Sequence, residues 1–227
     1  MKLLLLGATG TTGQTVLAEA LKRGHSVTVL VRESGSLPNK MHPQLTVVKG
    51  SFMHSGCLGN VVAGHDAVLL VAGSNGNTMP LTKCTANLVW QMNVTGVSRL
   101  LVLSRQGAGA SRKQMGTWWH WATRFLNRAV FEDHDQQEET VRQSGLAWTI
   151  VRPTDMSNSA PAGYVAAPTR QQLPASAQPR IARADVASFL LDQLIPSAPT
   201  RCALSIAGAA VRQPAREPRT SGQLVTG

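Results

Sequence analysis

Short apolar runs alternate with helical patterns from the start of the chain. Residues 3–6 are four consecutive leucines, which is typical of a strand buried on both faces of a parallel sheet. Within residues 12–23 apolar side chains recur at helical spacing, and Gly24 follows as the glycine that ends a helix. Residues 27–31 alternate valine with other side chains, as a second strand does. These residues predict a strand–helix–strand unit with a right-handed crossover.

The same alternation continues along the chain. Five more short apolar runs predict strands, at residues 45–48, 67–71, 99–103, 148–151 and 202–206. Four further runs predict helices, at residues 58–62, 78–94, 131–143 and 184–194. The pattern predicts an α/β fold of the Rossmann type, with a doubly wound, mainly parallel sheet of six to seven strands flanked by helices.

Two stretches interrupt this pattern. Residues 157–180 are rich in Ala, Pro, Ser and Gln and contain Tyr164, the only tyrosine, so we expect an irregular excursion beside the active site. From about residue 210 the chain is polar and basic. We therefore expect one domain over residues 1–208, with a substrate-side excursion at 155–180, and a disordered basic tail at 209–227.

Residues 116–129 hold three of the five tryptophans. Trp118, Trp121 and Phe125 share one face of a predicted helix, which fits packing in the core or an aromatic wall against a flat conjugated substrate. Arg124, on one side of this helix, could meet acidic groups of that substrate.

The formal net charge is +10, which raises the question of nucleic-acid binding. The basic residues are scattered, however, and a phosphate-bearing cofactor with an acidic substrate would also use some of them. The three cysteines are far apart and form no metal-binding pattern, so we expect no metal site and a cytoplasmic setting. The chain has neither an apolar run long enough for a membrane span nor the pattern of a signal peptide.

A glycine-rich turn follows the first predicted strand, with G-A-T-G-T-T-G at residues 7–13. Glycines there permit a tight turn, close approach of a pyrophosphate and close packing of helix on strand, and the helix N-terminus attracts phosphate. A glycine-rich turn without a ligand is the alternative, but its place between strand and helix favours a dinucleotide. The predicted contacts with the pyrophosphate are Gly7, Thr9, Gly10, Thr11, Thr12 and Gly13.

The tip of the second strand selects the cofactor. Arg32 suits the 2′-phosphate of NADP, with Ser34 and Ser36 as further donors, whereas Glu33 would suit the ribose of NAD. We favour NADP. Ala72 and Gly73 follow the predicted strand at 67–71, so their loop is expected beneath the dinucleotide.

Further motifs carry a resemblance to a known family. They are V-T-V-L-V-R-E-S at 27–34, A-G-H-D-A-V at 63–68, S-G-L-A-W-T-I-V-R-P at 144–153 and A-D-V-A at 184–187. With the glycine turn, they resemble the atypical short-chain dehydrogenase/reductase superfamily, and more closely its single-domain NAD(P)H-binding branch, which includes biliverdin-IXβ reductase/flavin reductase. The resemblance implies a monomer that binds NADPH.

The resemblance also implies roles for single residues. Ser51 and Phe52 match a contact with the cofactor, although Gly50-Ser51 replaces the usual Gly-Asp and weakens an expected contact with adenine. Pro153 matches the turn near the nicotinamide, and His134 matches a histidine expected to hold the nicotinamide ribose. Asp155 falls where the flavin reductase has a histidine beside the nicotinamide, and we expect it on the substrate side.

The chain departs from the superfamily at the catalytic positions. Many members use a Tyr-x-x-x-Lys pair, but Tyr164 has no lysine four residues later. The usual Ser-Ser after the fifth strand is Ser104-Arg105. We expect Ser104 to orient the substrate or the carboxamide, and Arg105 to face developing negative charge. The alternatives are a strand-end cap for Ser104, a surface charge for Arg105 and a solvated helix residue for His134.

These features favour an NADPH-dependent oxidoreductase that transfers hydride to a small conjugated, anionic acceptor: a flavin, a quinone or a linear tetrapyrrole such as biliverdin. The proton can then come from water, so the missing tyrosine is tolerated. A non-catalytic NADP-binding sensor is the alternative, because several catalytic residues are absent. An isomerase or dehydratase that uses bound cofactor also stays open.

Overall fold

The computed structural model describes residues 1–32, 37, 41–52, 54–73, 81–108, 128–168 and 171–209. The predicted helix at 116–129 therefore lies outside the described residues, apart from its last two positions, as do the start of the helix predicted at 78–94 and nearly all of the predicted tail. No helix in the described part of the chain is long and apolar enough to cross a membrane.

Helices and strands alternate as expected. In chain order they are β1 (Lys2–Leu6), α1 (Thr11–Lys22), β2 (Ser26–Val31), β3 (Leu45–Lys49), α2 (Ser55–Val62), β4 (Ala67–Leu70), α3 (Leu81–Thr95), β5 (Arg99–Leu103), α5 (Arg128–Arg142), β6 (Ala147–Pro153), β7 (Asp155–Ser157), β8 (Tyr164–Pro168), β9 (Arg180–Ala182), α6 (Arg183–Asp192) and β10 (Cys202–Gly208). Gly24, which has φ +78°, follows α1, as the sequence predicted.

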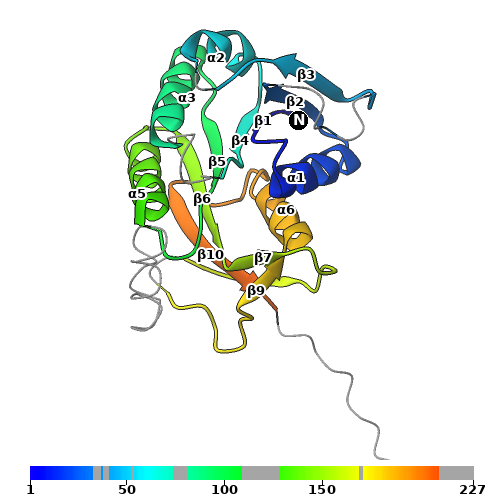
Figure 1. Ribbon diagram of the computed structural model, residues 1–227, viewed down its shortest axis with the longest axis vertical. Helices are drawn as coiled ribbons and strands as arrows, with labels where there is room; N and C mark the ends of the chain where they lie inside the picture. Colours follow the sequence, from blue (N-terminus) through cyan, green and yellow to red (C-terminus); the bar gives the residue numbers. More distant parts are fainter. Residues whose placement is uncertain are drawn as a thin grey trace, which may run out of the picture.

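Eight of these strands form one sheet, in the order β3-β2-β1-β4-β5-β6-β10-β8. Every neighbouring pair is parallel except β10 and β8. Helices α1 and α6 cover one face of the sheet, and α2, α3 and α5 cover the other (Figure 1). This confirms the Rossmann-type fold that the sequence predicted.

The leucine run of β1 is buried on both faces of the sheet. Leu3 and Leu5 join the apolar cluster that includes α1 and α6, whereas Leu4 and Leu6 join the cluster that includes α2 and α3. All four side chains are at most 1% exposed. Since β1 is covered on both faces, the strand has no polar alternation.

The order of the strands positions the functional site. The first strand, β1, lies between β2 and β4, so the chain winds outward from it in both directions. In such sheets ligands bind outside the carboxyl ends of the strands at this switch point. The glycine turn leaves β1 at this end.

The excursion after β6 is not irregular as predicted. It contains β7 and β9, which pair with each other, and β8, which pairs antiparallel with β10 at the edge of the main sheet. The Asp185 carboxylate accepts hydrogen bonds of 3.0 and 3.2 Å from the N–H groups of Ala162 and Gly163 and so holds the loop before β8. These partners are distant in the sequence, so local patterns did not reveal them. The sheet therefore has eight strands rather than six to seven.

Candidate functional site

The glycine turn has little room at two of its positions and open space at the third. Gly7 has φ +90°, and a Cβ there would lie 2.7 Å from the backbone nitrogen of Ala72. A Cβ on Gly13 would overlap the carbonyl oxygen of Gly7. Gly10 has extended backbone, and its Cβ would meet only that oxygen, at 3.5 Å. Packing therefore requires Gly7 and Gly13, whereas Gly10 leaves space for a ligand.

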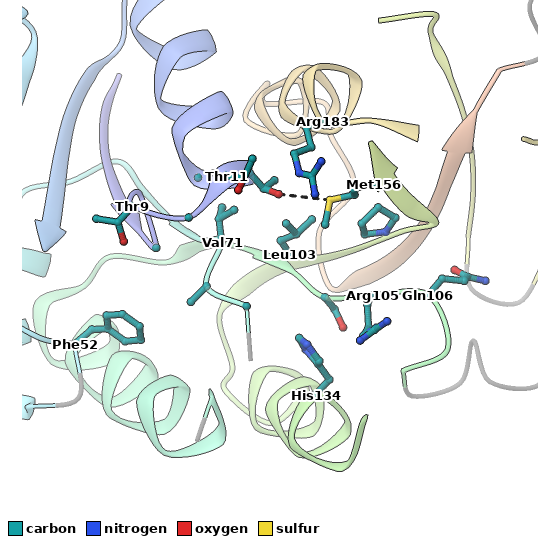
Figure 2. Close-up of a pocket in the computed structure, with 18 of the residues that line it drawn as sticks. Thr9, Thr11, Phe52, Val71, Leu103, Arg105, Gln106, His134, Met156 and Arg183 are labelled. Atoms are coloured by element: carbon teal, nitrogen blue, oxygen red, sulfur yellow. Dashed lines mark hydrogen bonds between the residues drawn. The ribbon is translucent and has the colours of Figure 1, made fainter. Parts of the chain in front are cut away.

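The turn forms one wall of a cavity of about 900 Å³ at the carboxyl ends of the strands. Figure 2 shows Thr9 and Phe52 at one end of it and Arg105 and Gln106 at the other. The structure places the following predicted site residues on its lining: Gly7, Thr9, Gly10, Thr11, Thr12, Gly13, Arg32, Ser51, Phe52, Ala72, Gly73, Ser104, Arg105, His134, Pro153 and Asp155. Trp118 and Arg124 lie outside the described residues.

One end of the cavity suits the adenosine of a dinucleotide. The exposed Arg32 follows β2 directly, and Ser51 and Phe52 lie after β3, the neighbouring strand. Glu33, the residue that would favour NAD, lies outside the described residues, as do Ser34 and Ser36.

The donors along the glycine turn fit the phosphates of such a cofactor. The first N–H groups of α1 have no acceptor within the helix and carry a partial positive charge. The hydroxyl groups of Thr9, Thr11 and Thr12 belong to the same wall. The space beside Gly10 lets a phosphate reach these donors without meeting a Cβ. The residues present therefore fit a dinucleotide cofactor.

At the other end of the cavity, the hydroxyl group of Ser104 is already engaged. Ser104 ends β5, is 4% exposed and donates a hydrogen bond of 2.7 Å to Oε1 of Glu138 on α5. Its proton therefore points into the protein, away from the cavity. What Ser104 can offer a ligand is its lone pairs, which accept hydrogen bonds.

The Glu138 carboxylate is held as an anion. Arg152 on β6 donates to it from Nε at 2.8 Å and from Nη2 at 2.6 Å, and Arg142 adds a bond of 2.7 Å. Burial alone would raise the pKa of Glu138, but Arg152, Ser104 and Arg142 together hold it below its ordinary value. Glu138 therefore stays ionised and accepts the hydrogen bond from Ser104, while the proton remains on the Ser104 hydroxyl group.

His134 lies on α5 with its ring at the cavity, 5% exposed (Figure 2). Burial and the nearby charge of Arg105 lower its pKa, despite the opposing effects of Gln137, Glu138 and Asp133, so the ring is neutral at pH 7. The side-chain nitrogen of Gln137 donates to Thr85, so its oxygen faces Nδ1 of His134, 3.2 Å away. With the proton on Nδ1, Nε2 is an acceptor, as a ribose hydroxyl group requires.

Arg105 supplies a cation beside Ser104. Its guanidinium lies 4.6 Å from the centre of the Phe131 ring, a cation–π contact that fixes its position. Burial lowers its pKa, and the charge of Asp155 opposes the shift, so the group stays protonated. Arg105 is thus available to a negative charge in the cavity.

Tyr164 is not a substitute for the missing catalytic tyrosine. Its hydroxyl group donates a hydrogen bond of 2.8 Å to Asp192, and burial together with this carboxylate raises its pKa to about 12. The described lining of the cavity does not include it.

Sequence reasoning missed several residues of the lining in the segment after β6. They are Thr154 directly after β6, Met156 in β7, and Pro179 and Arg183 on either side of β9. The A-D-V-A motif at 184–187 marked the start of α6, and the arginine directly before it was a signal that could have drawn attention to Arg183. The described lining carries three arginines, at 32, 105 and 183, and one carboxylate, at Asp155. The cavity is therefore suited to anionic ligands.

Comparisons with known proteins agree with this geometry. The model of a family described as NAD(P)H-binding matches residues 7–195. An uncharacterized chloroplastic protein of Arabidopsis thaliana is 29% identical over 176 residues, which are 72% of this chain and 62% of that protein. The chain thus spans less than two thirds of the length of this relative.

Solved structures of other proteins share the fold. A short-chain dehydrogenase/reductase (wide type) of Veillonella parvula, in complex with NADP, has a TM-score of 0.79 at 21% identity, covering 93% of this chain and 96% of its own. The anaerobillin reductase ChuY of Escherichia coli O157:H7 has a TM-score of 0.76 at 18% identity, covering 94% and 100%.

Proposed function

The chain belongs to the NAD(P)H-binding family, and we propose that it is an NADPH-dependent oxidoreductase that transfers hydride to a small conjugated acceptor, such as a flavin, a quinone or a linear tetrapyrrole. The observation that carries this proposal is the hydrogen bond from Ser104 to Glu138. Because the Ser104 hydroxyl proton is engaged in this bond, it is not available to protonate a carbonyl substrate. A conjugated acceptor can take hydride first and a proton from water afterwards.

Each residue near Ser104 then has a defined task. Nε2 of His134 accepts a hydrogen bond from the nicotinamide ribose, and Ser104 accepts one from an amide N–H group of the cofactor or the acceptor. Arg105 stabilises negative charge that develops on the acceptor. When bound, NADPH supplies the hydride. Replacement of Arg105 by Ala is expected to slow turnover of an anionic acceptor.

The preference for NADPH rests on Arg32. Its exposed guanidinium at the end of β2 can pair with the 2′-phosphate, and Ser51 nearby adds no negative charge. The NADP in the Veillonella parvula structure supports the same choice. We expect Arg32→Ser to weaken NADPH binding by about tenfold or more and to leave NADH binding nearly unchanged.

A titration tests the whole proposal. The protein is titrated with NADPH and with NADH by fluorescence, and flavin mononucleotide or a quinone is then added while nicotinamide absorbance is followed. Binding of NADPH with oxidation by an acceptor supports a reductase. Failure to bind either cofactor would contradict the assignment of the glycine turn.

A non-catalytic NADP sensor is the second candidate. Two hydrogen bonds favour it: Ser104 donates to Glu138, and Tyr164 donates to Asp192. Neither hydroxyl group then has a free proton to give to a substrate. A sensor would bind NADPH and oxidise none of it with any acceptor.

The proposal also includes a cytoplasmic location and a monomeric state. Cys57, Cys84 and Cys202 are free thiols, as in a reducing cytoplasm. We keep the expectation of a monomer, which light scattering after gel filtration would check.

A further inference from the structure

Two buried polar atoms beside the cavity have no partner. Nε of Arg183 and Oγ1 of Thr154 form no hydrogen bond with any residue that the structure describes. Both residues line the cavity. An unpaired buried donor is destabilising, so such atoms are expected where a ligand supplies the missing acceptor.

The position of Arg183 is fixed by the excursion. Parallel pairing of β7 with β9 joins Asp155 to Arg180 and Ser157 to Ala182, which brings the residue after β7 beside the start of α6. That residue, Asn158, accepts a hydrogen bond of 2.7 Å from Nη1 of Arg183. On the opposite edge of the guanidinium, which Nε and Nη2 form, Nε binds no acceptor in the described part of the chain. Two parallel N–H groups on one edge match two oxygens of a phosphate.

Arg183 also lies close to the glycine turn. Figure 2 shows its side chain reaching from α6 toward Met156, on the side of the cavity where Thr11 lies. The sulfur of Met156 is 3.7 Å from the hydroxyl oxygen of Thr12, so the two walls meet here. The turn itself contributes hydroxyl and N–H groups but no cation, which leaves a place for the charge of Arg183.

We propose that Arg183, with the Thr154 hydroxyl group, binds a phosphate oxyanion in the cavity. This proposal rests on the proposed function, because the phosphate comes from the pyrophosphate of the cofactor or from the acceptor. In either case Arg183 adds a positive charge beside the glycine turn.

The test compares Arg183→Gln with Arg180→Gln by calorimetric titration. Arg180 is an exposed arginine three positions earlier and is absent from the described lining, so its variant is the matched control. The ligands are NADP⁺ and 2′-AMP, which carries the 2′-phosphate without the pyrophosphate. If Arg183 binds the pyrophosphate, Arg183→Gln weakens NADP⁺ binding by about tenfold or more and leaves 2′-AMP binding unchanged.

A second arm covers the acceptor. Flavin mononucleotide and riboflavin share one ring system and differ in a phosphate, and quenching of their fluorescence reports binding to the NADP⁺-loaded protein. If Arg183 binds the phosphate of the acceptor, Arg183→Gln weakens binding of the mononucleotide alone. No change in either arm overturns the proposal. Both arms measure binding, so absence of hydride transfer would overturn the proposed reductase activity and leave the proposed phosphate site at Arg183 standing. A wild-type protein that binds no NADP⁺ would overturn both proposals.

Discussion

Arg152 on β6 and Glu138 on α5 form an ion pair with both side chains 0% exposed, and their closest atoms are 2.6 Å apart. The pair lies directly beneath Ser104, whose hydroxyl group donates to the same carboxylate. It joins a strand of the sheet to the helix that carries His134. The end of the cavity near Ser104 therefore depends on one buried carboxylate.

Removal of Arg152 is expected to destabilise the protein. Arg152→Met leaves Glu138 as a buried charge without its main partner, which costs about 3–5 kcal/mol of unfolding free energy. Denaturant unfolding measures this cost. Arg142→Met is the matched control, because Arg142 binds the same carboxylate from a partly exposed position and should cost about 1 kcal/mol or less. Equal losses in the two variants would contradict the role of the buried pair.

Glu138 should also shape the acid stability. Its pKa in the folded protein lies below the ordinary value of 4.5, so the unfolded chain binds more protons just below that pH. The stabilisation is therefore complete above pH 4.5 and is lost as the pH falls through the folded pKa, with a slope of at most ~1.4 kcal/mol per pH unit. Unfolding free energies of Glu138→Gln should fall less steeply in this range. Parallel curves for the two proteins would refute the assignment.

The glycine turn offers a pair of contrasting variants. Gly10→Ala should fold normally, since the backbone of Gly10 is extended and a Cβ there meets no close atom, yet it should lose affinity for NADPH. Gly13→Ala should unfold far more easily, because its Cβ would overlap the carbonyl oxygen of Gly7. Thermal unfolding and NADPH titration separate the two effects. A Gly10→Ala protein that binds NADPH as tightly as wild type would show that the phosphate lies elsewhere.

Replacement of Ser104 tests whether it donates a proton. General acid catalysis contributes about 10²- to 10⁴-fold to a rate. Since the Ser104 proton is committed to Glu138, Ser104→Ala should lower kcat by less than that, by about tenfold or less. A drop of a thousandfold in steady-state turnover would mean that Ser104 supplies the proton after all.

Much of this arrangement could be predicted from the sequence because it depends on short-range patterns. The four leucines of β1 and the three glycines after it lie within one strand, one turn and the start of one helix. They predicted both the fold and the wall of the cavity that the glycine turn forms. The ends of successive parallel strands meet at one edge, so Ala72 and Ser104 could be expected there too.

The rest depended on partners far apart in the chain. Arg183 reaches the cavity only because β9 pairs with β7, and β8 joins the sheet through β10. The hydrogen bond from Ser104 to Glu138 could not be predicted from the sequence either, since 34 residues separate the two. Glu138 looked like one of several polar residues on an amphipathic helix, and only its burial distinguishes it.

The most direct measurement is a single turnover. The protein is loaded with NADPH and mixed rapidly with flavin mononucleotide or a quinone, while the nicotinamide absorbance is followed; Tyr164→Phe serves as a control. We expect oxidation of the bound cofactor, slower when the transferred hydrogen is deuterium, and at the same rate in Tyr164→Phe as in wild type. Bound NADPH that stays reduced with every acceptor would contradict the reductase and leave an NADP-binding sensor.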